Sequence, residues 1–222
     1  MDKITKFLFF PLKGSYTTQL FGQDKTCTDT ETGKVFIGKK TEDTCPTGYI
    51  SLYKKMGLNG HNGVDLFAKM WQPVYASCDG FVEEVQTKES VGLGIGIITE
   101  KKYYCGETGK EEYFKYRNWH FQALNVVKNQ KIKTGDMIGW AGMTGYATGP
   151  HDHFELKPVA QNKKGEWYNI LQSNGYFGAI DPLPYLSTVC AVDANGIKKI
   201  TEGIAQLLDA LSTMLRGTPV MK

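Results

Sequence analysis

Two short segments that lie about ninety residues apart hold three of the four histidines in this 222-residue chain. They are Gly60-His61-Asn62-Gly63-Val64-Asp65 and Thr148-Gly149-Pro150-His151-Asp152-His153-Phe154-Glu155. On a β-strand, successive side chains alternate between the two faces, so His151, His153 and Glu155 share a face. The fold is therefore constrained to bring a strand with paired imidazoles close to a distant segment that carries a third.

His61 and Asp65 are four residues apart and share a face in a strand or in a helix, although the glycines and Val64 make a helix the poorer choice. On facing strands, two imidazoles and one carboxylate would form a three-ligand set. Such a set leaves one corner of a zinc tetrahedron open for water, as in catalytic rather than structural sites. A lone His-x-His pair is more often a surface or hydrogen-bonded pair, so this interpretation depends on both segments together.

Both segments, taken together, resemble the lysostaphin-like (LytM-type) zinc endopeptidases that cut peptidoglycan peptides. The likeness extends over residues 10–186, and one polar insertion interrupts it. Four further segments match the family in order: Pro73-Val74-Tyr75-Ala76, Asp79-Gly80-x-Val82, Lys133-x-Gly135-Asp136-x-Ile138-Gly139 and Gly142-x-Thr144-Gly145.

The resemblance implies roles for individual residues. Zinc would be bound by His61, Asp65 and His153, with His151 and His120 handling the proton and stabilising the oxyanion. Residues that we expect to bind substrate are Tyr53, Asn62 and Thr148. The zincin signature His-Glu-x-x-His is absent, and no Ser or Cys triad is recognisable.

Two positions depart from the family pattern. The family usually shows Tyr-x-His-Leu where this chain has Asn118-Trp119-His120-Phe121, which leaves an ordinary strand-end histidine as the alternative for His120. An apolar residue is usual at Asp152. Strand alternation turns Asp152 away from the metal, towards a partner on the far side of the sheet or towards solvent, so we expect Asp152→Leu to leave catalysis nearly unchanged.

Repeated short apolar segments with glycine punctuation, and no alternating helices, predict an all-β domain. The predicted strands cover Phe7 to Gly22, Pro73 to Gln86, Leu93 to Glu100, Glu112 to Phe121 and Lys133 to Trp140, with a hairpin tip at Cys105 to Lys110. By resemblance, the fold class is an antiparallel β-sheet sandwich with a groove across the central sheet. Residues 1–190 would form this zinc endopeptidase domain, and its polar insertion, 23–48, would be a surface loop or small hairpin beside the groove.

The five cysteines show no Cys-x-x-Cys spacing, so a structural zinc site with Cys ligands is not expected. Cys27 and Cys45 flank the polar insertion, which has too few apolar residues to hold itself folded. We hypothesise a Cys27–Cys45 disulfide that shapes one rim of the groove; two unrelated thiols in a mobile loop are the alternative. Cys78, in an apolar strand, is interpreted as a small buried hydrophobic residue.

Residues 191–222 are predicted to form an amphipathic helix, with apolar residues at three- and four-residue spacing through 197–215. Packing on the sheet domain is one interpretation. Self-association or docking to a larger particle is the other.

Composition restricts the partners. A formal charge of +3 suits an anionic cell wall, and with no dense Lys/Arg block and no known motif we expect no nucleic-acid binding. We expect no membrane span, because no stretch reaches the roughly 18 apolar residues required. No signal peptide is recognised, so action on the wall, outside the cell or from a virion, would require lysis, a phage particle, a dedicated secretion machine or an upstream N-terminus.

The predicted function is zinc-dependent hydrolysis of peptide bonds in peptidoglycan cross-links or bridges through a metal-activated water. The alternatives are a non-catalytic wall-binding relative and a structural component of a virion or secretion apparatus that keeps the fold. Which peptide bond would be cut is not determined by the sequence.

Overall fold

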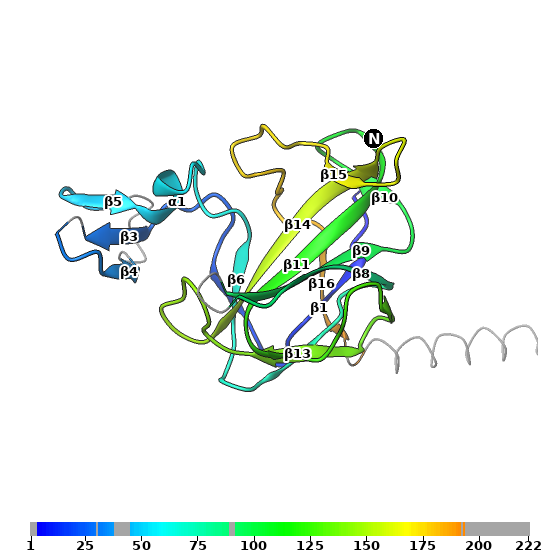
Figure 1. Cartoon of the computed structure of the whole chain (residues 1–222), viewed down its shortest axis with the longest axis horizontal. Coiled ribbons are helices and arrows are strands. Elements are labelled where there is room, and N and C mark those ends of the chain that lie inside the picture. The colour runs from blue at the N-terminus through cyan, green and yellow to red at the C-terminus, as the bar shows by residue number, and fades with distance from the viewer. Residues whose placement is uncertain (1–3, 30, 38–44, 89–91, 192, 194–222) are drawn as a thin grey trace, which may run out of the picture.

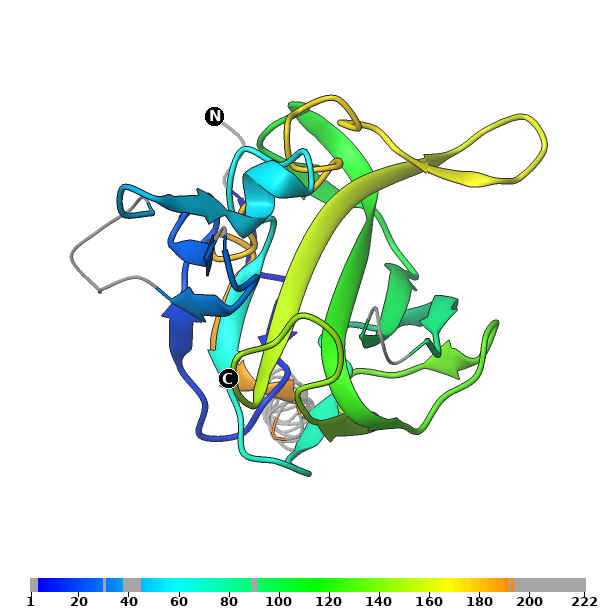
Figure 2. The same ribbon diagram turned by 60° about the vertical axis from the view of Figure 1, so that its left-hand side comes forward.

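A pair of long antiparallel strands, β11 (Lys110–Leu124) and β14 (His151–Gln161), forms the centre of the molecule (Figures 1 and 2). The computed structural model describes residues 4–29, 31–37, 45–88, 92–191 and 193. Within this part of the chain, the two strands belong to an eleven-stranded sheet whose main path is β12-β8-β9-β11-β14-β6-β2. The all-β fold with a large antiparallel sheet is therefore confirmed.

The remaining strands of this sheet are short. Their bounds are β2 (Thr17–Gln19), β6 (Val64–Phe67), β7 (Pro73–Tyr75), β8 (Gly80–Gln86), β9 (Leu93–Thr99), β10 (Tyr103–Cys105), β12 (Lys131–Ile132), β13 (Met137–Ala141) and β15 (Trp167–Asn169). Strand β10 forms the predicted hairpin with β11, and β13 pairs with both β11 and β7. A separate two-stranded sheet joins β1 (Leu8–Phe10) to β16 (Leu186–Cys190) in parallel.

Two predicted strands are divided in the structure. The predicted strand 73–86 consists of β7 and β8, because the Asp79 carboxylate accepts hydrogen bonds from the backbone N–H and hydroxyl of Thr134 and holds a turn between them. The predicted strand 7–22 consists of β1 and β2, and Gly14 lies between them with a φ of 67°. Positive φ is strained for residues with a Cβ, so glycine suits this position.

Alternation along the two central strands separates core from groove. Phe114, Tyr116, Phe154 and Leu156 are fully buried on one face, and the Tyr116 and Phe154 rings stack with centroids 6.0 Å apart. Burying a large apolar side chain contributes about 1.5–3 kcal/mol. This layer fixes the register of β11 on β14, and so fixes which residues face the groove on the opposite side.

The polar insertion forms a small sheet of its own at one side of the molecule (Figure 1). Its strands are β3 (Thr26–Asp29), β4 (Val35–Ile37) and β5 (Tyr49–Ser51), in the order β4-β3-β5, and the short helix α1 (Leu52–Lys55) follows. The predicted hairpin is β3–β4; β5 and α1, outside the predicted bounds, were missed. The Cys27–Cys45 disulfide is confirmed, with Cα atoms 5.6 Å apart.

The predicted C-terminal helix lies outside the described residues over 194–222, which includes 197–215, so it stays a prediction, as does the domain boundary at 190. Among the described residues, no helix is long and apolar enough to cross a membrane. Cys78 is buried as predicted, with 4% of its surface exposed.

Candidate active site

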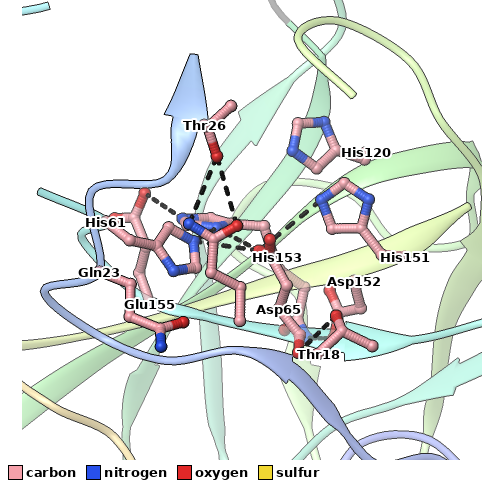
Figure 3. A network of polar contacts seen from close by, with 12 residues as sticks. Thr18, Gln23, Thr26, His61, Asp65, His120, His151, Asp152, His153 and Glu155 are labelled. Carbon is pink, nitrogen blue, oxygen red and sulfur yellow. Dashed lines mark hydrogen bonds and ion pairs between the residues drawn. The ribbon is translucent and has the colours of Figure 1, made fainter. Parts of the chain in front are cut away.

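Three side chains converge where β6 and β14 pair. Asp65 lies on β6 directly opposite His153 on β14, and His61 comes from the loop before β6 (Figure 3). Asp65 Oδ1 is 3.0 Å from both His61 Nε2 and His153 Nδ1, and these two nitrogens are 2.8 Å apart. The structure therefore brings together the three residues predicted to bind metal.

Glycines next to these residues make the approach possible. A Cβ on Gly63 would lie 2.5 Å from the Phe154 carbonyl oxygen and 2.9 Å from His153 Cε1. A Cβ on Gly60 would lie 2.4 Å from the Gly22 carbonyl oxygen. Distances this short force the backbone apart, so glycine is required at both positions for His61 and Asp65 to reach β14.

The donor set fits a tetrahedral zinc site. Zn–N and Zn–O bonds of about 2.0–2.2 Å place neighbouring ligand atoms about 3.3 Å apart, slightly wider than the 2.8–3.0 Å found here. Outer partners orient both rings, as is usual for histidine ligands. His61 Nδ1 donates to the Leu20 carbonyl at 3.0 Å, and His153 Nε2 lies 3.5 Å from Glu155 Oε1. One nitrogen of each ring is thus left for the metal.

The electrostatics of the metal-free cluster agree with this role. Burial alone would raise the pKa of Asp65, but the surrounding imidazoles, first of all His61, hold it well below its usual range. Burial alone would lower the pKa of His153, but Asp65 and Glu155 raise it to about 9. The metal-free cluster therefore holds a proton at neutral pH, and metal binding releases it.

His151 and His120 lie together beside the cluster, with ring centroids 4.6 Å apart (Figure 3). His151 Nδ1 donates to the Gly149 carbonyl at 2.8 Å, and His120 Nδ1 donates to the Thr144 carbonyl at 2.7 Å. A carbonyl can only accept, so Nδ1 carries a proton in both rings, and in a neutral ring the lone pair is then on Nε2. His151 Nε2 is 3.7 Å from Asp65 Oδ1. Burial, together with the charges of His151 and His153, lowers the pKa of His120 to about 3, so this ring is neutral.

His120 reaches the groove through a β-bulge. Regular alternation from Tyr116 and Asn118, which face the core, would turn His120 into the core as well. The pairing of β11 with β9 instead shifts between Trp119↔Gly94 and Phe121↔Leu93, and His120 has a φ of 66°. An extra residue in one strand re-aims side chains in this way. Sequence alternation alone could not predict this geometry.

A groove of about 380 Å³ passes over the site. Its lining includes the three predicted substrate-binding residues, Tyr53, Asn62 and Thr148. The Tyr53 hydroxyl is already hydrogen-bonded to Gln19 Nε2 at 2.8 Å and to Thr26 Oγ1 at 2.9 Å, and burial raises the pKa of Tyr53. Sequence spacing did not indicate Gln19 or Thr26, because their contacts with Tyr53 join residues 27 or more positions apart.

The groove is also lined by charged residues, Arg117, Glu155 and Lys157, for which the sequence predicted no role. Arg117 donates to Glu155 Oε2 at 3.0 Å and to Glu84 Oε1 at 2.8 Å, and the Lys157 ammonium is 3.0 Å from Glu155 Oε2. The Arg117 guanidinium also lies over the Trp119 ring, 4.4 Å from its centroid. Alternation, which placed Glu155 on the face of His151 and His153, also places Lys157 there and could have identified it from the sequence.

Asp152 points away from the site, as predicted. It is fully buried on the core side of the sheet, and its Oδ2 accepts a hydrogen bond of 2.8 Å from Asn118 Nδ2. Burial raises the pKa of Asp152 to about 7. The partner on the far side of the sheet is therefore Asn118.

Residues 59–165 match the family model described as Peptidase family M23. The glycyl-glycine endopeptidase ALE-1 of Staphylococcus capitis is 30% identical over 158 residues, covering 64% of this chain and 40% of that protein. The peptidoglycan DD-endopeptidase ShyA of Vibrio cholerae is 36% identical over 96 residues, covering 43% of this chain and 20% of that protein. This chain thus spans less than half the length of either relative.

Among solved structures, the catalytic domain of lysostaphin from Staphylococcus simulans is 29% identical to this chain. The alignment covers 57% of this chain and 79% of that domain, with a TM-score of 0.42.

Proposed function

The chain carries a peptidase domain of family M23 over residues 59–165, and from this domain and its site we propose that the protein is a zinc-dependent endopeptidase that hydrolyses peptide bonds of peptidoglycan. The observation that carries the proposal is the convergence of His61, Asp65 and His153 within 3.0 Å, beside two histidines that keep a lone pair on Nε2.

We assign binding of the metal to His61 Nε2, Asp65 Oδ1 and His153 Nδ1. When bound, zinc supplies a water of pKa about 7 in place of about 15.7 and polarises a peptide carbonyl. Leu20 and Glu155 keep the two ligand rings in position through their second nitrogens.

His151 and His120 handle the proton. His151 Nε2 lies 3.7 Å from the ligand carboxylate and is not assigned to the metal, so it accepts a proton from the attacking water and returns it to the leaving amine. His120 is neutral in the free protein because it is buried, and its ring lies beside His151. When negative charge develops on the substrate, His120 Nε2 would take up a proton and donate to the oxyanion. The backbone carbonyls of Gly149 and Thr144 fix both tautomers.

The substrate is proposed from the groove and from the named activities of the relatives, a glycyl-glycine endopeptidase and a DD-endopeptidase. The second of these relatives is named for peptidoglycan, the polymer of the bacterial wall. An open groove across a sheet accepts an extended peptide chain, with Asn62 and Thr148 positioned to bind its backbone. The protein would then act on the wall, outside the cell or from a virion.

Purified peptidoglycan tests the proposal directly. The zinc-loaded chain should release new amino termini, detectable by dinitrophenyl labelling, without releasing new reducing sugar ends. A chelator should stop the release, and added zinc should restore it. Binding to the wall without any new amino termini would overturn the enzymatic proposal in favour of a wall-binding protein.

A further inference from the structure

The two departures from the family pattern, at Asn118 and Asp152, contact each other. Asn118 lies on β11 and Asp152 on β14, both are fully buried, and they share the 2.8 Å hydrogen bond described above. An amide and a carboxyl group buried together in an apolar layer are costly unless they are paired. Their presence behind the catalytic strand calls for a structural reason.

The pair lies at the end of the β11–β14 ladder, directly before the bulge. The last paired residues are Trp119 on β11 and His153 on β14. One step further along β14 is Asp152, which would stand opposite His120 if the strands continued in register. Asp152 therefore contacts β11 through Asn118, two residues before His120.

A second set of hydrogen bonds, made by Thr144, holds the same bulge. The Thr144 hydroxyl donates to the Phe121 carbonyl at 2.9 Å and accepts from the Leu93 N–H at 2.9 Å, while its own carbonyl accepts from His120 Nδ1. Thr144 thus secures the residue after the bulge. Strand β11 is therefore held on both sides of His120: before it by the Asn118–Asp152 hydrogen bond, and after it by the hydrogen bond from Thr144 to Phe121.

We propose that Asn118 and Asp152 are positioning residues, whose hydrogen bond holds the β11 bulge so that His120 faces His151 in the groove. This inference builds on the proposed function, but its geometric content stands apart from activity. It also replaces the expectation that Asp152→Leu is neutral: a leucine faces the core equally well, but it leaves the Asn118 amide buried without its acceptor. If β11 shifts so that the Asn118 amide finds another acceptor, His120 moves with it.

Within the described part of the chain, Asn118 and Asp152 each leave one side-chain oxygen without a hydrogen bond, which supports a positioning role for the single bond between them. Among the described residues, Asp152 Oδ1 and Asn118 Oδ1 have no hydrogen-bond partner, so the one bond between the two side chains is their main link. Substituting Asn118 removes this bond by a change on β11, and substituting Asp152 removes it by a change on β14. The two single substitutions should therefore displace the same ring.

The test uses the zinc-loaded full chain with ¹⁵N-labelled histidine. In Asp152→Leu, the ring signals of His120 should shift while those of His61 stay in place and zinc content is unchanged. On a peptidoglycan peptide, kcat should fall about tenfold to a hundredfold, the range expected for misplacement by about an ångström, with KM changed less than threefold. Asp152→Asn, which keeps an oxygen that can accept from Asn118, should restore both.

Two further variants keep the test decisive. Asn118→Ala attacks the pair from β11 and should give the same His120 shift if Asp152→Leu fails to fold. Thr99→Val is the matched control: Thr99 is buried on β9 and bonded to the Phe114 N–H away from the groove, so it should lower stability without moving His120. Unchanged His120 signals in both pair variants, or an equal shift in Thr99→Val, would overturn the proposal. If the wild type cuts no peptide, the proposed function fails, and the histidine signals still decide the positioning role.

Discussion

The two regions that wall the groove are held together by different forces. The central sheet encloses one hydrophobic cluster whose buried members come from residues 7–12 and 64–186; of the described residues between 13 and 63, only the partly buried Phe21 packs against it. The insertion sheet instead relies on the Cys27–Cys45 bond, on a hydrogen bond from the Ser51 hydroxyl to the Asp24 carboxylate, and on the hydroxyl network around Tyr53.

The difference divides the work of the site. The proposed ligands and the two histidines proposed to handle the proton lie on or beside the apolar sheet, where packing holds them in fixed positions. The insertion and the segment that follows it supply only wall residues: Thr26, Val35, Leu52, Tyr53, Met56 and Leu58. Damage to the sheet should therefore affect turnover and folding, whereas damage to the insertion should affect substrate binding.

The largest expected effect is on the sheet side, at His151. We expect His151→Ala to lower kcat by about 10²–10⁴-fold, roughly 3–5 kcal/mol of barrier, because it removes the proton acceptor. Zinc content should be unchanged, and His120→Ala should behave in the same way. Steady-state kinetics with elemental analysis measures both, and loss of zinc in either variant would mean that ligand and catalyst are exchanged.

A core substitution separates the two regions by stability. Ile97 on β9 is fully buried, so we expect Ile97→Ala to lower the free energy of unfolding by about 2–5 kcal/mol in urea denaturation. Ile50 on β5 is 49% exposed, and Ile50→Ala should change the free energy of unfolding by less than about 0.5 kcal/mol. Equal losses would show that the insertion shares the core after all.

The disulfide is the corresponding test of the insertion. Its cysteines are 18 residues apart, and a bond closing such a loop contributes about 3 kcal/mol in the chain-entropy model. We expect the double substitution Cys27→Ser/Cys45→Ser to expose residues 26–51 to proteolysis and to raise KM, with kcat nearly unchanged. A fall in kcat at constant KM would contradict the division of roles.

Only a small effect is expected at the ion pair between Lys54 and Asp24. Their charged atoms are 3.2 Å apart, but the Lys54 side chain is 65% exposed, so solvent screens the attraction. Lys54→Met should cost no more than about 1 kcal/mol of local stability, with no detectable change in KM. Proteolysis rates and KM of Lys54→Met should be measured together with those of the double cysteine variant. A rise in KM as large as in the double cysteine variant would contradict a minor role for the Lys54–Asp24 ion pair.

Much of the site could be predicted from the sequence, because it depends on strand alternation and on spacing. The shared face of His151 and His153 and the inward-facing Asp152 are period-two properties, which a strand preserves. The Cys27–Cys45 pairing followed from a polar segment that could not fold unaided. The meeting of the two histidine segments came from the family resemblance, since contacts across ninety residues leave no local signal.

What could not be predicted depends on breaks in regular structure. The bulge at His120, the turn at Asp79 that splits one predicted strand, and the third strand of the insertion all arise from tertiary hydrogen bonds. The hydrogen bond between Asn118 and Asp152 is of the same kind. In the sequence, Asn118 and Asp152 are two separate departures from the family pattern, and only the pairing of β11 with β14 shows that they contact each other.

Zinc content measured across three forms of the protein tests the account most directly. Elemental analysis after dialysis should find about one zinc per chain in the wild type and in His151→Ala, and almost none in His153→Ala, because only His153 lies within 3.0 Å of Asp65 and His61. Full zinc occupancy in His153→Ala, or its loss in His151→Ala alone, would contradict the assignment of the metal to His61, Asp65 and His153.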